Sequence, residues 1–411
     1  MQAYRQALAI VQNRPVPAPQ PMEPFNESRP AVQNNTQAVA VPNFTAIDVT
    51  DDIARTQILS VWKTNRSWDG IRMTEDQAAY DSLMSSAEAE WEYVTDGSIL
   101  GGTGNTFGVE IEMEFESSGA WDRVARDLYN EGLSQYSERV GYHTAGGMWM
   151  PTRDGSLTNG GLEIVSPILQ DRPEDWEQLR RVLEIAKYHG AVVNGNTGCH
   201  TNIGSGPVDS RAFSWQRLAR AALGHEAALY RMGGADSEKY RSAGTAGVHR
   251  GTGYVRTLGD ITFGGNATMA EIKYQITKED HATLLNVMHD GRVEFRSPNG
   301  TLDARQIQAN VVVANAMMHQ AATITNSSPL DNTTPKLSDY ANQVGYTAVQ
   351  TARLKDDLQW AARHGQDTST LEQNIANREA KAELGFRRFL DFLGNPVDRK
   401  AAAWLYKRGS I

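Results

Sequence analysis

The sequence predicts an α+β fold, in which a mainly antiparallel sheet packs with separate helices. Residues 107–116 place apolar side chains at every second position and, from Glu110 on, acidic ones between them, which is the period of a strand with one apolar and one charged face. Residues 173–188 and 305–323 instead carry apolar side chains at the three- and four-residue spacing of helices. We therefore expect strands and helices in one core.

The composition narrows the classes of protein to consider. The 411 residues are 40% hydrophobic and 22% charged, as in ordinary globular proteins, and can form a large core. A formal net charge of −9, without blocks of Lys or Arg, argues against a nucleic-acid surface. The only cysteine, Cys199, excludes an internal disulfide and a Cys-rich zinc module.

Targeting and membrane signals are not apparent in the sequence. Residues 1–14 lack the basic start, apolar run and cleavage site of a secretory signal. No segment approaches the roughly 18 uncharged apolar residues that a membrane helix requires. We expect a soluble, cytoplasmic protein that binds neither membranes nor nucleic acid.

We divide the chain into four regions by composition and periodicity. These are a disordered arm rich in Pro, Gln and Asn (1–50), a small helical region (51–98), the main domain (99–325) and a helical C-terminal region (326–411). Within the main domain we expect helices at 121–136, 173–188, 210–230 and 305–323, and strands at 107–116, 146–150, 161–165, 191–194, 270–277 and 291–297. Loops are expected at 237–265, and C-terminal helices at 346–363 and 371–393. The Gly-rich segment 101–105 lacks the Lys-Ser/Thr of a phosphate loop, so we interpret it as a turn.

The acidic strand is the first candidate for a chemical role. Its alternation sends Glu110, Glu112, Glu114 and Glu116 to one face, where neighbouring carboxylates stand roughly 6.6 Å apart. Such a face repels itself unless water, basic side chains or metal ions screen it. An exposed face of an ordinary sheet is the alternative interpretation.

Three further segments carry groups suited to metal-bound phosphates. Asp154 lies in an Asp-Gly-Ser turn, and Glu163 follows on the next expected strand. His200 and Asn202 are two residues apart, so a strand would place both on one face. Glu294 and Arg296 share a strand face in the same way.

Each of these segments also has a purely structural interpretation. Asp-Gly-Ser is a common turn, and an isolated His is usually structural. Neighbouring Glu and Arg side chains on a strand often form a surface ion pair, which contributes little to stability.

Together the segments resemble the amidoligase family of the glutamine synthetase-like carboxylate-amine ligases. The resemblance rests on five motifs in order over about residues 105–320: Phe107 to Glu112, Asp154 to Ser156 with Gly161 to Pro167, Gly198 to Asn202, Lys273-Tyr274, and Val293 to Arg296 with Gly300 to Asp303. It implies a curved, mainly antiparallel sheet with helices on its convex side. The implied activity is formation of an amide or isopeptide bond through an acyl phosphate, with ATP and Mg²⁺ as cofactors.

The resemblance also implies roles for individual residues. Glu110, Glu112, Glu163 and Glu294 look like metal ligands. His200 looks like a metal or phosphate contact, with Asn202, Lys273 and Arg296 also on the nucleotide side. The catalytic residues implied are His200, Arg296 and Asp154, the last as an acid on the substrate or metal side. Two departures bear on substrate choice and metal occupancy: Asn202 stands where many relatives carry a second His, and Gln275 follows Lys273-Tyr274 where relatives often continue to an Asn.

The leading functional hypothesis is therefore a ligase that joins a carboxylate to an amine, with a peptide or protein among the candidate substrates. The main alternative is a non-catalytic binding or assembly protein that keeps the ligase fold, because the terminal regions are long. A metal-dependent hydrolase is a third hypothesis, since carboxylates and a His can activate water. The hydrolase hypothesis explains Arg296 less well, because hydrolysis does not require an arginine that binds a triphosphate.

Overall fold

The structure is a computed structural model, and it describes residues 68–95, 99–141, 146–157, 161–234, 266–277, 281–335 and 348–409, with isolated residues between 255 and 264. The arm predicted at 1–50 and the first part of the helical region predicted at 51–98 lie outside the described residues. Most of the loops predicted at 237–265 lie outside them too.

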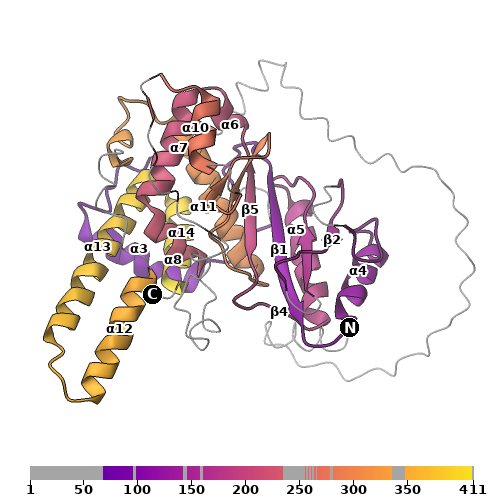
Figure 1. The fold of residues 1–411 in the computed structure, drawn as a ribbon. Coiled ribbons are helices and arrows are strands. Elements are labelled where there is room, and N and C mark those ends of the chain that lie inside the picture. The colour runs from indigo at the N-terminus through magenta and orange to yellow at the C-terminus, as the bar shows by residue number, and fades with distance from the viewer. Residues whose placement is uncertain are drawn as a thin grey trace, which may run out of the picture. The chain divides into compact units, whose positions relative to one another are not determined.

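An open antiparallel sheet forms the centre of the domain (Figure 1). Its strands follow the order β2-β3-β1-β5-β7-β6, and β4 also pairs with β1. The strands are β1 (Phe107–Phe115), β2 (Met150–Thr152), β3 (Leu162–Val165), β4 (Ala191–Val192), β5 (Cys199–Gly204), β6 (Leu285–Asn286) and β7 (Arg292–Phe295). This confirms the predicted α+β class with an antiparallel sheet.

Strand β1 confirms the alternation seen in the sequence but corrects one interpretation of it. Its apolar side chains are buried, and the ring of Trp176 stacks on Phe107 with ring centroids 4.5 Å apart. The acidic face is not exposed to solvent either, because Glu110 and Glu112 are only 9% and 2% exposed. The alternative of an ordinary solvent-exposed face is therefore wrong for these two residues.

The helices that precede the C-terminal region pack beside the sheet or against other helices. They are α3 (Gln77–Glu90), α4 (Ala120–Asn130), α5 (Pro173–Tyr188), α6 (Gly206–Asp209), α7 (Ala212–Gly224), α8 (Glu226–Gly233), α10 (Met269–Thr277) and α11 (Ala304–Thr323). Helix α5 has the predicted bounds because Pro173 starts it with two acids in its first turn, and the backbone turns at Gly190 with φ of 80°.

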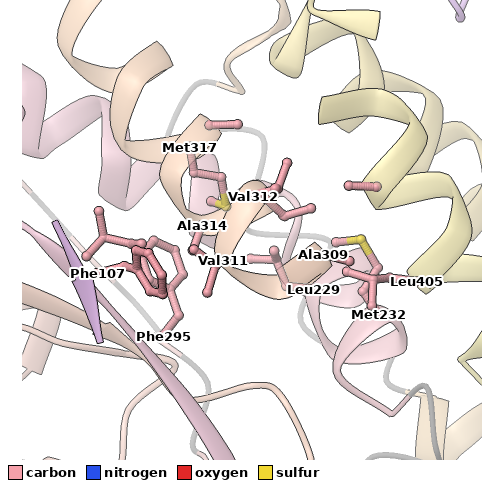
Figure 2. Packing of buried hydrophobic residues seen from close by; sticks show 14 of the residues in the cluster. Phe107, Leu229, Met232, Phe295, Ala309, Val311, Val312, Ala314, Met317 and Leu405 are labelled. Atoms are coloured by element: carbon pink, nitrogen blue, oxygen red, sulfur yellow. The ribbon is translucent and has the colours of Figure 1, made fainter. Parts of the chain in front are cut away.

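Helix α11 connects the sheet to the C-terminal helices. Asp303 caps it by accepting a hydrogen bond from the Arg305 N–H (3.0 Å), and almost every residue along it is buried. Figure 2 shows Phe107 and Phe295 of the sheet on one side of this helix, and Met232 and Leu405 on the other. The apolar face of the sheet is thus covered, and its charged face is the opposite one.

One predicted strand is wrong, because residues 269–277 form helix α10. The sequence Ala270-Glu-Ile-Lys-Tyr-Gln-Ile also alternates with period two, which suggested a strand. The deciding signal is a capping box: the Thr268 N–H donates to Glu271 Oε2 (2.7 Å), and the Glu271 N–H donates to Thr268 Oγ1 (3.3 Å). Ile272 and Ile276, four residues apart, are then both fully buried while Tyr274 is exposed.

Three other predicted elements differ from the structure by more than two residues or by a break. The helix predicted at 121–136 ends at Asn130, because the backbone turns at Gly132 with φ of 70° and the Leu133 N–H donates back to Leu128 O (2.9 Å). The helix predicted at 210–230 divides into α7 and α8 at His225. Strand β2 lies at Met150–Thr152 rather than 146–150, and it accommodates Pro151 because it is an edge strand.

The C-terminal region is helical, as predicted, with α12 (Ala348–Arg363), α13 (Ser369–Leu393) and α14 (Pro396–Arg408), after a short 3-10 turn at Asp331–Thr333. Helices α13 and α14 contribute buried side chains to the same core as α11. Among the described helices, none combines the length and apolar character needed to cross a membrane.

Candidate functional site

The charged residues predicted from separate segments meet on one face of the sheet. The strand register pairs Glu110 with His200, Glu112 with Glu163, and Asn202 with Glu294. Directly paired residues in antiparallel strands point to the same side of a sheet. The pairing therefore gathers carboxylates from β1, β3 and β7 around the histidine of β5.

The first group of side chains is Glu110, His200 and Glu294. Nδ1 of His200 lies 3.2 Å from Glu110 Oε2 and 3.2 Å from Glu294 Oε1. One potential ligand atom from each of the three residues lies within 4.8 Å of the others, and all three residues are buried. We call this the histidine group.

The second group is Glu112, Asp154 and Glu163, whose potential ligand atoms also lie within 4.8 Å of one another. Glu112 Oε2 accepts a hydrogen bond from the Gly198 N–H (2.6 Å). Asp154 Oδ1 accepts from the Ser156 N–H (2.5 Å), which confirms the turn predicted there. We call this the carboxylate group. It adjoins the histidine group, because His200 Nε2 lies 3.9 Å from Glu112 Oε1.

The carboxylate group brings like charges together around Glu163. Burial, and then the nearby Glu110 carboxylate, raise the pKa of Glu163 from 4.5 to about 9, against the lowering effect of the Thr152 hydroxyl. Glu112 and Asp154 act in the same direction as Glu110. A cation within the group would relieve this repulsion.

The donor set fits a divalent cation of the Mg²⁺ or Mn²⁺ type. Mg²⁺ takes oxygen ligands, and its usual protein ligands are one or two carboxylates together with substrate phosphates. The carboxylate group offers oxygen atoms alone, whereas the histidine group adds an imidazole nitrogen, which Mn²⁺ and other transition ions accept. The residues present could therefore hold divalent cations in both groups.

Arg292, the first residue of β7, and Arg296, the residue after its end, border the histidine group. Arg296 Nη1 contacts Glu294 Oε1 closely and lies 3.4 Å from His200 Nδ1. Arg292 Nη2 lies 3.9 Å from Glu110 Oε1. The Nε atoms of both arginines are buried and have no hydrogen-bond partner among the described residues. These N–H groups retain capacity for an anion such as a phosphate.

Asn202 lies within the same face, 6% exposed. Its Nδ2 donates to Glu110 Oε1 (3.0 Å), whereas its Oδ1 is buried with no partner among the described residues. The amide thus supports a carboxylate on one side and offers an unfilled acceptor on the other. This differs from a second imidazole, which would add a potential ligand nitrogen.

Lys273 is the one predicted site residue that contacts neither of the two groups among the described residues. Its ammonium lies 3.6 Å from Asp209 Oδ1 and 4.5 Å from the centre of the Trp215 ring. The helical geometry of α10 explains the placement, because the strand expected here would have belonged to the sheet. Its proposed contact with a nucleotide stays a prediction.

Two residues of the site were missed by sequence reasoning. Thr152 Oγ1 donates to Glu163 Oε2 (2.8 Å), and Asn286 Nδ2 donates to Glu294 Oε2 (2.7 Å). The segments that carry them are too short to show a period, so no pattern in the sequence identifies these neutral donors.

Comparison with known proteins agrees with the family suggested by the motifs. Residues 60–243 match a family model described as a putative amidoligase enzyme, which confirms the resemblance over that range. No curated protein matches the sequence. A solved structure described as apo GmaS without ligand is similar at 15% identity over 73% of each chain, with a TM-score of 0.31. That score is below the level that identifies a shared fold.

Proposed function

We propose that this chain, whose residues 60–243 match the amidoligase family, is an ATP- and Mg²⁺-dependent ligase that joins a carboxylate to an amine. The observation that carries the proposal is the meeting of Glu110, Glu112, Glu163 and Glu294 on one buried sheet face beside two arginines. Buried carboxylates at this density call for cations, and the adjacent guanidinium groups suit phosphate oxygens.

The proposed reaction has two steps. A substrate carboxylate oxygen attacks the γ-phosphorus of ATP, which forms an acyl phosphate and releases ADP. An amine nitrogen then attacks the acyl carbon, the C–O bond to phosphate breaks, and the nitrogen loses a proton. Bound divalent cations would neutralise phosphate charge during the first step.

The side chains have distinct parts in this scheme. The histidine group and the carboxylate group would each hold a divalent cation. Arg296 and Arg292 would bind oxygen atoms of the transferring phosphate through their unpartnered N–H groups. Asn202 Oδ1 would accept a hydrogen bond from a donor on the bound nucleotide. Asp154 would act as a metal-side or substrate-side acid.

The proposal is tested without knowing the natural amine. Hydroxylamine replaces the amine and converts an acyl phosphate into a hydroxamate, which ferric chloride detects by colour. A panel of amino acids and peptides serves as the carboxylate source, with Mg·ATP. We expect hydroxamate and ADP to form together with at least one acid, and the signal to fall at least 100-fold in Glu294→Gln.

Glu116→Gln is the matched control, because Glu116 continues the acidic segment but is exposed beyond the end of β1. It should keep the wild-type rate. Hydroxamate formation that survives in Glu294→Gln and Glu112→Gln would contradict the proposal. A wild-type protein whose melting temperature is indifferent to Mg·ATP would instead favour the non-catalytic alternative.

A further inference from the structure

We infer that Thr152 and Asn286 are positioning residues, each holding one oxygen of a carboxylate from an outer strand of the sheet. Thr152 would serve the carboxylate group through Glu163, and Asn286 would serve the histidine group through Glu294. The inference rests on the proposed function, because it treats these carboxylates as cation ligands.

Thr152 lies on edge strand β2, directly opposite Glu163 in the register. It is fully buried, and its Oγ1 donates to Glu163 Oε2 (2.8 Å). Among the described residues, it is the only side chain that donates a hydrogen bond to Glu163. A single donor on one oxygen fixes the orientation of the carboxylate and leaves the other oxygen available.

Asn286 lies on β6 at the opposite edge of the sheet, directly opposite Glu294. It is 2% exposed, and its Nδ2 donates to Glu294 Oε2 (2.7 Å). Its Oδ1 accepts from the Met288 N–H (3.0 Å). Because that backbone donor fixes the amide orientation, the NH₂ group must face Glu294. The other oxygen of Glu294 is left facing His200 and Arg296.

Both supports are neutral, and this matters for cation binding. A Lys or Arg at either position would neutralise the carboxylate and compete with a cation. A hydroxyl or an amide orients the carboxylate without removing its charge. Residues that orient metal ligands typically contribute 10- to 100-fold to metal affinity.

The test is a Mn²⁺ titration followed by electron paramagnetic resonance and calorimetry, with the full chain and without nucleotide. Two reference variants show which Mn²⁺ binding step belongs to which group. Glu163→Gln should abolish Mn²⁺ binding at the carboxylate group, and Glu294→Gln should abolish it at the histidine group. Thr152→Val, which is nearly isosteric, should weaken the first step about tenfold and spare the second. Asn286→Leu should weaken the second step about tenfold and spare the first.

Matched controls separate positioning from general destabilisation. Thr152→Ser keeps the hydroxyl and should restore the wild-type affinity. Thr283→Val removes a buried hydroxyl that donates to Leu285 O (2.7 Å), and Asn315→Leu removes a buried amide that pairs with Asn105. These two variants should lose thermal stability but keep both Mn²⁺ affinities.

The outcomes distinguish the two proposals. Wild-type protein that binds no Mn²⁺ would contradict the proposed cation sites themselves. If Thr152→Val and Asn286→Leu keep both Mn²⁺ binding steps while each Glu variant loses one, only the positioning role is overturned. Equal weakening of both steps in either variant would also overturn it, because the inference assigns each residue to one group.

Discussion

Glu163 is a buried carboxylate whose ionisation is unfavourable in the folded protein. It is 2% exposed, and burial with neighbouring carboxylates raises its pKa to about 9. A carboxyl whose pKa is higher in the folded protein than in the unfolded chain makes the fold less stable as pH rises above the unfolded value. The folded protein therefore bears a cost at neutral pH that a bound cation would offset.

We accordingly predict that Glu163→Gln stabilises the cation-free protein. In a chelating buffer at pH 7, the free energy of unfolding should rise by about 2 to 3 kcal/mol, because the ionisable group is replaced by a neutral one. Addition of Mn²⁺ should raise the melting temperature of the wild type more than that of the variant. Urea unfolding measures the first effect and a thermal shift the second; a variant less stable than the wild type in chelator would contradict the account.

The candidate site was predictable from sequence where side chains alternate, and at Asp154, where a turn motif marks the position. Glu110, Glu112, Glu163, His200 and Glu294 each stand on a strand whose period fixes the face they share. Thr152 and Asn286 reach the same carboxylates from strands of three and two residues, where no period can be read. Their role follows from strand pairing, which the sequence does not specify.

Among the secondary-structure elements, helix α10 shows how a capping box distinguishes a helix from a strand when the apolar side chains fit both periods. Ile272 and Ile276 fit both a strand and a helix, and the reciprocal hydrogen bonds of Thr268 and Glu271 favour the helix. The pattern Thr-x-x-Glu was present in the sequence and is the cue that could have corrected the prediction.

We predict that Thr268→Ala costs about 1 kcal/mol of unfolding free energy, because the first turn of α10 loses its cap. Denaturant unfolding measures the change, and Thr268→Ser should recover most of it. No change in stability would mean that the contacts of the buried isoleucines alone determine the helix.

The break between α7 and α8 places a histidine in an aromatic core. His225 is 2% exposed, with ring centroids 5.1 Å from Phe389 and 6.0 Å from Phe392 of α13. Burial lowers the pKa of His225 from 6.5 to about 3. The neutral ring is therefore the form that the folded protein holds.

This predicts a defined pH dependence for the contact between α8 and α13. The unfolded chain takes up a proton near pH 6.5 and the folded protein does not, so stability is complete above pH 6.5 and declines as pH falls toward 3. Between pH 7 and pH 5, His225 should account for about 2 kcal/mol of the loss. His225→Leu should be less sensitive to acid by that amount in urea unfolding at the two pH values, and an unchanged pH dependence would argue against the buried neutral ring.

At the scale of the whole molecule, the C-terminal helices are joined to the start of the described chain by a buried ionic network. Arg399 of α14 is 1% exposed, and its guanidinium donates to Asp69 (2.8 Å) and to Ile71 O (2.8 Å). It also lies 3.8 Å from Asp391 of α13, which accepts from the Met73 N–H (2.6 Å). Ion pairs and hydrogen bonds thus join segments that are more than 300 residues apart in sequence.

We predict that Arg399→Met destabilises the protein by about 1 to 3 kcal/mol, because the carbonyl oxygens of Leu390 and Ile71 lose their buried donor and Asp391 loses a nearby positive charge. Arg378→Met, on a more exposed part of α13, should change stability much less. Thermal unfolding measures both. Equal effects of the two substitutions would show that the network does not hold the termini of the domain together.

The proposed function requires two adjacent groups of side chains on the charged sheet face to bind divalent cations beside a triphosphate. Anomalous diffraction from crystals grown with Mn²⁺ and a non-hydrolysable ATP analogue would locate these cations. We predict one anomalous peak among Glu110, His200 and Glu294, a second among Glu112, Asp154 and Glu163, and phosphate density near Arg296. Ordered nucleotide elsewhere, or Mn²⁺ peaks that avoid both groups, would contradict the account.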